Sequence, residues 1–419
     1  MPGNTNVRGT LLVVGGGNQI RHEHLLAQMA QEADLVLLTP QPADWQLRWV
    51  GDTEVFDPKD ADDVLRSAKE LVSRTPADAV VTFEEAHVVL TAQIGEALGL
   101  PGMPVEAAEL ARDKKLQRDL LTRTGLSPTR SVLVHDFAAA RAAAEEIGYP
   151  VVVKPQGLSG SAGVRRVEHE AELEEALRNA TAAPSMGMAA KGLLIEEYLD
   201  GYEFSVDFWV SGGEAVMVYG NRKLWGFDPY PIEVGQICGR DALDLPALQP
   251  GIQLAHDSVL AAGFDRVVAH IEVKMTSAGP RIVELNARPA GGLSPRVIEL
   301  ACGVKTGAAL AAAALGRRPD TESFEDRAAG LLFLYPAARM RFAGLAPAPR
   351  LRDRPWLHDV CEYTAHGTVV APPPEDVFGQ VGHVIVTGSD AEEVHDRLLL
   401  AEHELRVLGD PTERACAGH

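Results

Sequence analysis

Residues 270–292, HIEVKMTSAGPRIVELNARPAGG, most constrain what this chain can fold into. Polar residues alternate with Ile, Val and Leu on both sides of TSAGP, which predicts two β-strands joined by a hairpin loop, each with one polar face. Acids, an amide and a guanidinium are poor occupants of a buried sheet, so this polar face requires a binding partner.

The polar face carries Glu272 on the first strand and Glu284, Asn286 and Arg288 on the second. Folding the hairpin back places Glu272 beside Glu284 and Asn286. Adjacent carboxylates repel unless a cation lies between them, and carboxylate and amide oxygens suit Mg²⁺. Arg288 then lies beside the metal and can bind an anion. The alternative is a solvated edge hairpin; His270 is interpreted as structural.

Upstream lysines and a glycine-rich loop fit a phosphate-bearing ligand. Lys154 ends the apolar strand 149–155, where an ammonium needs a counter-ion, and the loop QGLSGSAG (156–163) follows it. Backbone N–H groups and hydroxyls of such a loop can cover anionic oxygens. The alternatives are a strand-end lysine that reaches solvent at position 154 and, for Lys114, an exposed and solvated helix.

Two further segments bear on nucleotide binding. Glu196 and Glu197 in LIEEYLDGYEFSVD alternate faces of a strand, so at least one should face a cleft; the alternative is a solvated strand end. The turn GGGN (15–18) lacks the full GxGxxG spacing, and we interpret it as a tight turn from strand to helix rather than a nucleotide site.

Length and charge restrict the class of protein. A chain of 419 residues is too long for one ordinary core, so two or three domains are expected. The net charge of −20 opposes binding to nucleic acid or an anionic membrane, and we see no long Lys/Arg run. The four cysteines lack CxxC spacing, and no run of 18 apolar residues occurs, so a cytoplasmic protein is expected.

The order of apolar segments predicts an α/β region followed by α+β structure. Short buried strands at 10–14, 34–40 and 78–83 alternate with helices, as in a parallel sheet, and one helix is expected over 106–123. The predicted domains are 1–105, a Rossmann-like N-terminal domain; 106–191, a small central domain; and 192–419, a C-terminal domain with a tail subdomain.

Together these motifs resemble the ATP-grasp superfamily in order and spacing, especially its carboxylate–amine ligase branch and the L-amino-acid ligases that make dipeptides. The resemblance covers roughly residues 10–310, and the motif at 270–292 is its most specific part. It implies a Rossmann-like N-domain, a small lid domain and a C-terminal antiparallel-sheet domain, with ATP between the last two.

The resemblance also implies roles for individual residues. Glu272, Glu284 and Asn286 would hold Mg²⁺, with two ions expected and Mn²⁺ able to substitute. Lys154 and Arg288 would be catalytic, Arg288 stabilising an acyl phosphate and the tetrahedral intermediate. The implied ATP-binding residues are Lys114, Lys154, Ser159, Gly160, Ser161, Glu196, Glu197, Leu199 and Glu203.

Substrate residues follow from two other segments that resemble the family. Glu85 in VVTFEEAHV aligns with an acid that meets the substrate amine. In DPYPIEVGQICG, Glu233 is present but Gln236 stands where a His is usual. Gln cannot become cationic, so the role of that His does not transfer to this chain. Together with Arg288, these residues form the expected substrate site.

The expected function is an ADP-forming ligase that joins a small carboxylate to an amine through an acyl phosphate, with ATP and Mg²⁺ as cofactors. Another ATP-grasp chemistry stays open, either biotin-carboxylase-like or a ligation in purine synthesis, and so does a regulatory module that binds nucleotide without turnover. Small molecules are the expected partners, and a homodimer is left open.

Overall fold

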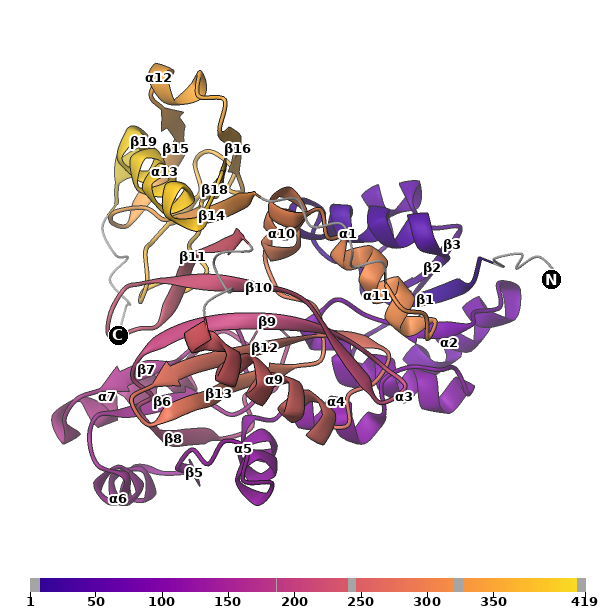
Figure 1. Ribbon diagram of the computed structural model, residues 1–419, viewed down its shortest axis with the longest axis horizontal. Helices are drawn as coiled ribbons and strands as arrows, with labels where there is room; N and C mark the ends of the chain where they lie inside the picture. Colours follow the sequence, from indigo (N-terminus) through magenta and orange to yellow (C-terminus); the bar gives the residue numbers. More distant parts are fainter. Residues whose placement is uncertain (1–7, 186, 240–245, 320–326, 413–419) are drawn as a thin grey trace.

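The computed structural model describes residues 8–185, 187–239, 246–319 and 327–412 (Figure 1). Cys416 lies outside this range, and none of Cys238, Cys302 and Cys361 forms a disulfide. Among the described residues, no single helix is long and apolar enough to cross a membrane. Two helices, Ser294–Cys302 and Thr306–Ala314, pass that test only jointly, with a 106° bend between them.

The N-terminal region is a four-stranded parallel sheet in the order β3-β2-β1-β4. The predicted strands at 10–14, 34–40 and 78–83 are confirmed with small changes of length, and they form because runs of Leu and Val are buried on both faces. The elements are β1 (Thr10–Val14), α1 (Gln19–Glu32), β2 (Asp34–Thr39), η1 (Trp45–Arg48), β3 (Asp52–Val55), α2 (Ala61–Arg74), β4 (Ala79–Val81), η2 (Glu85–His87) and α3 (Val88–Leu98).

The prediction of one helix over 106–123 is wrong, because the chain forms α4 (Val105–Ala111) and α5 (Lys114–Arg123). The break arises at Asp113, which has extended backbone angles and accepts hydrogen bonds from the first amides of α5. Because Asp113 caps α5 with an extended backbone, α4 cannot continue through it. Lys114 therefore lies on the first turn of α5.

A small antiparallel sheet in the order β5-β8-β6-β7 follows and matches the expected lid. Helices α6 and α7 cover it with an Ala-rich apolar face. The elements are β5 (Ser131–Val134), α6 (Phe137–Ile147), β6 (Val151–Pro155), β7 (Arg165–Val167), α7 (Glu170–Thr181) and β8 (Leu193–Glu197).

The largest sheet has eight strands in the order β13-β12-β9-β10-β11-β14-β18-β16, and a three-stranded sheet β17-β15-β19 lies in the tail. The predicted TSAGP hairpin between β12 and β13 is confirmed, and a second hairpin, at SGG, joins β9 to β10. The strands are β9 (Tyr202–Ser211), β10 (Glu214–Gly226), β11 (Ile232–Gly239), β12 (Val267–Thr276), β13 (Gly279–Asn286), β14 (Ala328–Leu334), β15 (Met340–Pro347), β16 (Leu357–Glu362), β17 (Val369–Val370), β18 (Gly382–Gly388) and β19 (Leu405–Pro411). The helices are η3 (Pro246–Leu248), α9 (Gln249–Ala261), α10 (Ser294–Cys302), α11 (Thr306–Ala314), α12 (Pro349–Arg352) and α13 (Ala391–Glu404).

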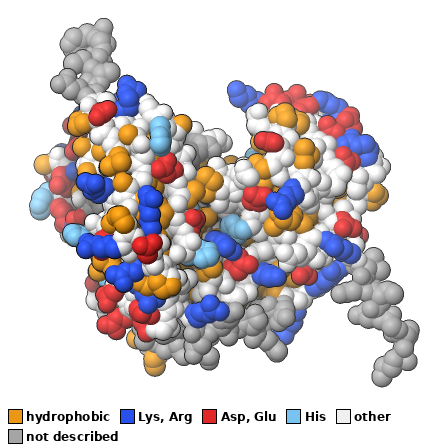
Figure 2. Space-filling model, turned by 90° about the horizontal axis from the view of Figure 1, so that it is seen from above, with side chains coloured by type: hydrophobic (Ala, Val, Ile, Leu, Met, Phe, Trp, Pro, Cys, Tyr) orange, Lys and Arg blue, Asp and Glu red, His pale blue; other side chains and the backbone are white. Residues whose placement is uncertain are grey.

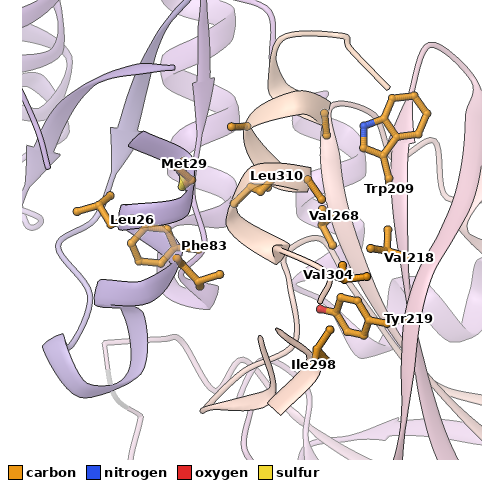
Figure 3. Close-up of a cluster of buried hydrophobic side chains, with 14 of the residues drawn as sticks. Leu26, Met29, Phe83, Trp209, Val218, Tyr219, Val268, Ile298, Val304 and Leu310 are labelled. Carbon is orange, nitrogen blue, oxygen red and sulfur yellow. The ribbon is translucent and has the colours of Figure 1, made fainter. Parts of the chain in front are cut away.

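A hydrophobic core joins the N-terminal region to one face of the large sheet (Figure 3). Leu26 and Met29 of α1 lie on one side, Leu310 of α11 lies in the middle, and Val268 and Trp209 of the sheet lie on the other. This packing fixes the N-terminal region against the sheet that carries the acidic hairpin. The boundaries at 105 and 191 stay predictions.

Candidate active site

A cavity of about 470 Å³ lies between the lid sheet and the large sheet. Its lining includes every residue that the sequence assigned to ATP, together with two of the three assigned to the metal. These residues are Lys114, Lys154, Ser159, Gly160, Ser161, Glu196, Glu197, Leu199, Glu203, Glu272 and Glu284. The lining does not include Asn286, Arg288, Glu85, Glu233 or Gln236.

Lys154 has the counter-ion that its burial requires. Its Nζ lies 2.5 Å from Oε2 of Glu196, and the Nε of Arg118 lies 2.9 Å from Oε1 of the same carboxylate. Burial lowers the pKa of Lys154 to about 8, even though Glu196 opposes that shift. Burial alone would raise the pKa of Glu196, but Arg118 and Lys154 outweigh it and lower the value to about 2. Both side chains of this pair therefore carry charge at neutral pH.

Lys114 is buried rather than solvated, with 8% of its surface exposed. Its Nζ lies 2.8 Å from Oε1 of Glu284 and also donates to the carbonyl oxygen of Leu158. It therefore joins the first turn of α5 to one predicted metal ligand and to the start of the glycine-rich loop.

The glycine-rich loop curls over the cavity through left-handed backbone angles. Gly160 has φ +63° and Ser161 has φ +57°. A Cβ at position 160 would lie 3.0 Å from the ring of Phe378, so the loop also touches the C-terminal tail. Among the described residues, the Ser159 hydroxyl has one contact, 3.7 Å from Sδ of Met188, which leaves its hydrogen-bonding capacity for a ligand.

The end of β8 and the segment that follows it form another part of the cavity wall. The Glu197 side chain accepts from Arg130, whereas the Leu199 carbonyl oxygen accepts from Nζ of Lys274 at 3.1 Å. Glu203 is buried 3.7 Å from both Lys223 and Lys274, and burial raises its pKa to about 7 despite these two lysines. A carboxyl group of this kind can donate or accept a hydrogen bond near neutral pH.

The acidic hairpin has the predicted register. Glu272 pairs with Glu284, and His270 with Asn286, in antiparallel strands. Glu272 contacts Nζ of the buried Lys223. Asn286 is buried, and its Oδ1 makes no hydrogen bond to any described residue. Buried polar oxygens rarely stay unpaired, so this one is suited to a ligand.

A divalent cation fits this donor set. Among the described residues, no three His, Cys, Asp or Glu side chains converge to form a metal site alone. Two carboxylates and the unpaired amide oxygen of Asn286 nevertheless make a hard oxygen set, to which phosphate oxygens of a nucleotide would add. Lys114 and Lys223 balance the two carboxylates in the structure.

His270, interpreted from the sequence as structural, lies between two acids, and its Nε2 is 3.5 Å from Oε1 of the predicted metal ligand Glu272. Its Nδ1 lies 2.6 Å from Oδ1 of the fully buried Asp207. Burial alone would lower the pKa of His270, but Asp207 outweighs it and raises the value to about 9. The other oxygen of Asp207 accepts from the amide of Ala290 at 2.9 Å. Asp207 thereby fixes the loop that follows Arg288.

The predicted substrate residues lie outside the lining of this cavity. Glu85, on η2, contacts Nε of Arg288 through one oxygen and Nη1 of Arg112 through the other. Burial alone would raise the pKa of Glu85, but Arg288 and Arg112 lower it. Seen from above, a hollow lies between the tail and the N-terminal region, and His, basic and acidic side chains gather along it (Figure 2).

Glu233 and Gln236 lie on β11. Oε2 of Glu233 lies 3.3 Å from Nζ of Lys223, so it shares this lysine with Glu272. Gln236 is buried, and its Oε1 accepts from the Ser294 hydroxyl at 2.8 Å. The structure therefore brings Glu85 to Arg288, and Glu233 to the metal-site lysine, whereas Gln236 bonds to the first turn of α10.

Sequence reasoning missed four charged residues in this region: Arg112, Arg118, Asp207 and Lys223. Asp207 interrupts an apolar strand, and Arg112 and Arg118 lie on the turns around Lys114, which is the signal that could have identified them. Lys223 follows Asn221 and Arg222 and gives no such signal. A charged side chain in a buried segment needs a partner, whether or not it belongs to a recognised motif.

The fold and the cavity define a protein that binds a nucleotide between a lid and an antiparallel sheet. Residues 147–296 match the ATP-grasp domain and residues 34–102 match the ATP-grasp N-terminal domain. The chain belongs to the ATP-grasp family, and its relatives are consistent with the carboxylate–amine ligase branch.

Three similar proteins illustrate this. The alanine–anticapsin ligase of Bacillus subtilis (strain 168) is 27% identical over 254 residues, 56% of this chain and 53% of that protein. The phosphoribosylamine–glycine ligase of Xanthomonas axonopodis pv. citri is 29% identical over 301 residues, 66% of this chain and 67% of that protein. The structure of an L-amino acid ligase from Bacillus licheniformis superposes with a TM-score of 0.82 at 22% identity, covering 96% of this chain and 100% of that one. The chain thus spans about half of the first relative.

Proposed function

We propose that this protein is an ADP-forming carboxylate–amine ligase that makes an amide or peptide bond on amino acids or other small carboxylic acids. The observation that carries the proposal is the acidic hairpin. Glu272 and Glu284 face each other across two strands, the oxygen of Asn286 beside them is unpaired, and both acids open onto a cavity lined with lysines.

The nucleotide would lie in that cavity. Lys114 and Lys154 would neutralise phosphate oxygens, and Ser159, Gly160 and Ser161 would cover them. Glu196 would act mainly by holding Lys154, while backbone groups near Glu197 and Leu199 would meet the base and Glu203 the ribose. Mg²⁺ held by Glu272, Glu284 and Asn286 would supply charge neutralisation at the β- and γ-phosphates, and Mn²⁺ would substitute.

The reaction would proceed in two transfers. An oxygen of the substrate carboxylate bonds to the γ-phosphorus as the bond to ADP breaks, and this gives an acyl phosphate. The amine nitrogen then attacks the acyl carbon, phosphate leaves, and the nitrogen loses a proton. Arg288 would stabilise charge on the acyl phosphate, and Glu85 would orient the amine. Lid closure would exclude water from the intermediate.

The small-molecule substrates would approach from the side of Glu85, Glu233 and Gln236. We propose the cytoplasm as the compartment, in keeping with cysteines that form no disulfides among the described residues. We also propose a homodimer as the assembly, which light scattering can test.

The test supplies ATP, Mg²⁺ and pooled amino acids and other carboxylic acids, follows phosphate release and weighs the products by mass spectrometry. ADP, phosphate and an amide are expected. Release of AMP and pyrophosphate would contradict the mechanism. Separate reactions that contain phosphoribosylamine with glycine, or bicarbonate with biotin, test the other ATP-grasp chemistries. Binding of ADP and Mg²⁺ with no acid-dependent phosphate release would indicate a regulatory module instead.

A further inference from the structure

Arg112 lies between α4 and α5, immediately before the acid that caps α5. Its Nη1 contacts Oε1 of Glu85, and its Nη2 donates to the carbonyl oxygen of Gly157 at 2.7 Å. Only 10% of the side chain is exposed. One guanidinium therefore touches both the predicted substrate site and the start of the glycine-rich loop.

Glu85 is shared between two guanidinium groups. Oε1 contacts Arg112 and Oε2 contacts Arg288, with 12% of the Glu85 side chain and 14% of the Arg288 side chain exposed. Among the described residues, Glu85 is the carboxylate within ion-pair distance of either arginine. The remaining contacts of the two groups are to the carbonyl oxygens of Gly157 and Pro289 and to Sδ of Met188.

The charges of this cluster do not balance. Two permanently charged arginines share the one carboxylate within ion-pair distance, in a mostly buried place. Glu284 and Glu272 also act on Arg288, but each is already paired with a lysine, so one guanidinium charge is left without a carboxylate of its own. The nearby Lys114 is itself paired with Glu284. Burial lowers the pKa of His22, on α1, to about 3, so the imidazole adds no charge at neutral pH. One bound monoanion would complete the cluster.

We propose that Arg112 is a substrate-positioning residue, and that Arg112 and Arg288 together bind the carboxylate of a monoanionic acid, with Glu85 holding the two guanidinium groups apart. This inference rests on the proposed ligase function and names its substrate class. A monocarboxylate neutralises the excess charge, whereas a dicarboxylate leaves an unpaired negative charge in the site.

The Gly157 bond connects acid binding to the lid. A Cβ at position 157 would lie 2.2 Å from the carbonyl oxygen of Ala189, so the start of the loop has no room to shift sideways. A carboxylate bound by Arg112 would therefore stabilise the bond from Arg112 to this fixed point, and with it the loop that continues to Ser159 and Ser161 and would cover the nucleotide phosphates. Acid and nucleotide are expected to stabilise each other's binding.

The experiment compares Arg112→Gln, Arg112→Lys and, as a matched control, Arg123→Gln at an exposed position on α5. With the acid that supports phosphate release, R112Q should raise KM for the acid about 10- to 100-fold and change KM for ATP less than about 3-fold. R112K, which keeps the charge but loses the fork, should fall between, and R123Q should match wild type. Wild type should prefer monocarboxylates over dicarboxylates of equal length.

A second readout needs no turnover. Hydrogen exchange of residues 157–163 with ADP and Mg²⁺ should slow when the acid is added to wild type, but not when it is added to R112Q. Equal increases of both KM values, or an unchanged KM for the acid, would overturn the inference while leaving the ligase intact. If an acid slows hydrogen exchange of residues 157–163 but no acid supports phosphate release, the proposed ligase function is wrong and the carboxylate-binding site still stands.

Discussion

The nucleotide side and the acceptor side of this active site are built differently. On the nucleotide side, lysines, a glycine-rich loop and a hairpin of acids line one cavity of about 470 Å³. On the acceptor side, where the substrates are expected, Arg112 and Arg288 both contact Glu85, and Gln236 bonds to Ser294. The first side has space ready for its ligand, whereas the polar groups of the second already bond within the protein, with one guanidinium charge left for an anion.

This difference indicates what each side must do when a ligand arrives. The cations of the nucleotide side already lie at a cavity wall, with acids behind them, so phosphate oxygens add to existing pairs. The acceptor side must redistribute ion pairs around Glu85. Substitutions on the nucleotide side should therefore reduce turnover with every acid, whereas substitutions on the acceptor side should change which acid is used.

The largest expected effect is at the acidic hairpin. Glu284→Gln keeps the size of the side chain but removes one carboxylate from the predicted metal site, so kcat should fall by about 10³-fold. The Mg²⁺ concentration needed for half-maximal ADP binding should rise as well. Steady-state kinetics and calorimetric titration of Mg²⁺ measure the two effects.

The matched control is Glu214→Gln, which removes an exposed carboxylate paired with Arg318 on the same sheet. It should retain wild-type turnover, because an exposed pair contributes little. If E284Q keeps more than a tenth of wild-type activity, the metal assignment is wrong and the two sides lose their main distinction.

The next effect concerns stability. Arg118 bonds to Glu196 and donates to the carbonyl oxygens of Ile282 and Val283, so it ties α5 to β13. Arg118→Met removes this group and leaves buried acceptors unpaired, which should lower the free energy of unfolding by about 3 kcal/mol. Urea denaturation measures the change. Arg123→Met is the exposed control, and a loss of under about 1 kcal/mol in R118M would show that the cluster is not a structural tie.

Lys154 gives the nucleotide side a pH dependence. Because its pKa in the ligand-free protein is about 8, the ammonium loses its proton as pH rises above that value. Bound phosphate favours the protonated form, so ADP affinity should be constant below pH 8 and fall by up to about 10-fold per pH unit above it. Binding above pH 8 should also take up a proton, which titration calorimetry in buffers of different ionisation enthalpy detects.

Lys154→Arg is the control for this prediction, because arginine stays charged throughout the range. Its ADP affinity should not decline between pH 8 and pH 9. Identical pH profiles for the two proteins would assign the decline to another group and would remove Lys154 from the phosphate site.

The sequence predicted the nucleotide side better than the acceptor side for a physical reason. Alternation along a strand determines which residues share a face, so Glu272, Glu284 and Asn286 could be placed from one segment. Lys154 and the glycine-rich loop could likewise be predicted from one continuous segment of sequence. These predictions needed only the period of a β-strand and one hairpin turn.

The acceptor side depends on contacts between distant segments. Glu85, Arg112 and Arg288 meet because two cores pack the N-terminal region and α4 against the large sheet, one through α1 and α11 and the other through α3 and α4. Strand period cannot reveal such a meeting, and Arg112 was missed because its neighbours predicted a continuous helix. The capping role of Asp113, which breaks that helix, was the local signal that could have corrected it.

The smallest expected effect is at Gln236. Gln236→His restores the residue that is usual in the family, but in a buried position where an imidazole would be neutral near pH 7. The Ser294 hydroxyl can still donate to the ring nitrogen. We expect KM for the acid or amine to change about 3- to 10-fold, with kcat and KM for ATP within about 2-fold of wild type.

Competition between acids sharpens this last prediction. Wild type and Q236H are each given a mixture of acids at equal concentration, and the products are weighed. A changed product ratio with unchanged ATP kinetics fits an acceptor side that selects substrates independently of the nucleotide side. If Q236H instead raises KM for ATP as much as KM for the acid, β11 serves both ligands. The active site would then behave as one unit, in which the ion pairs around Lys223 connect Glu233 to Glu272.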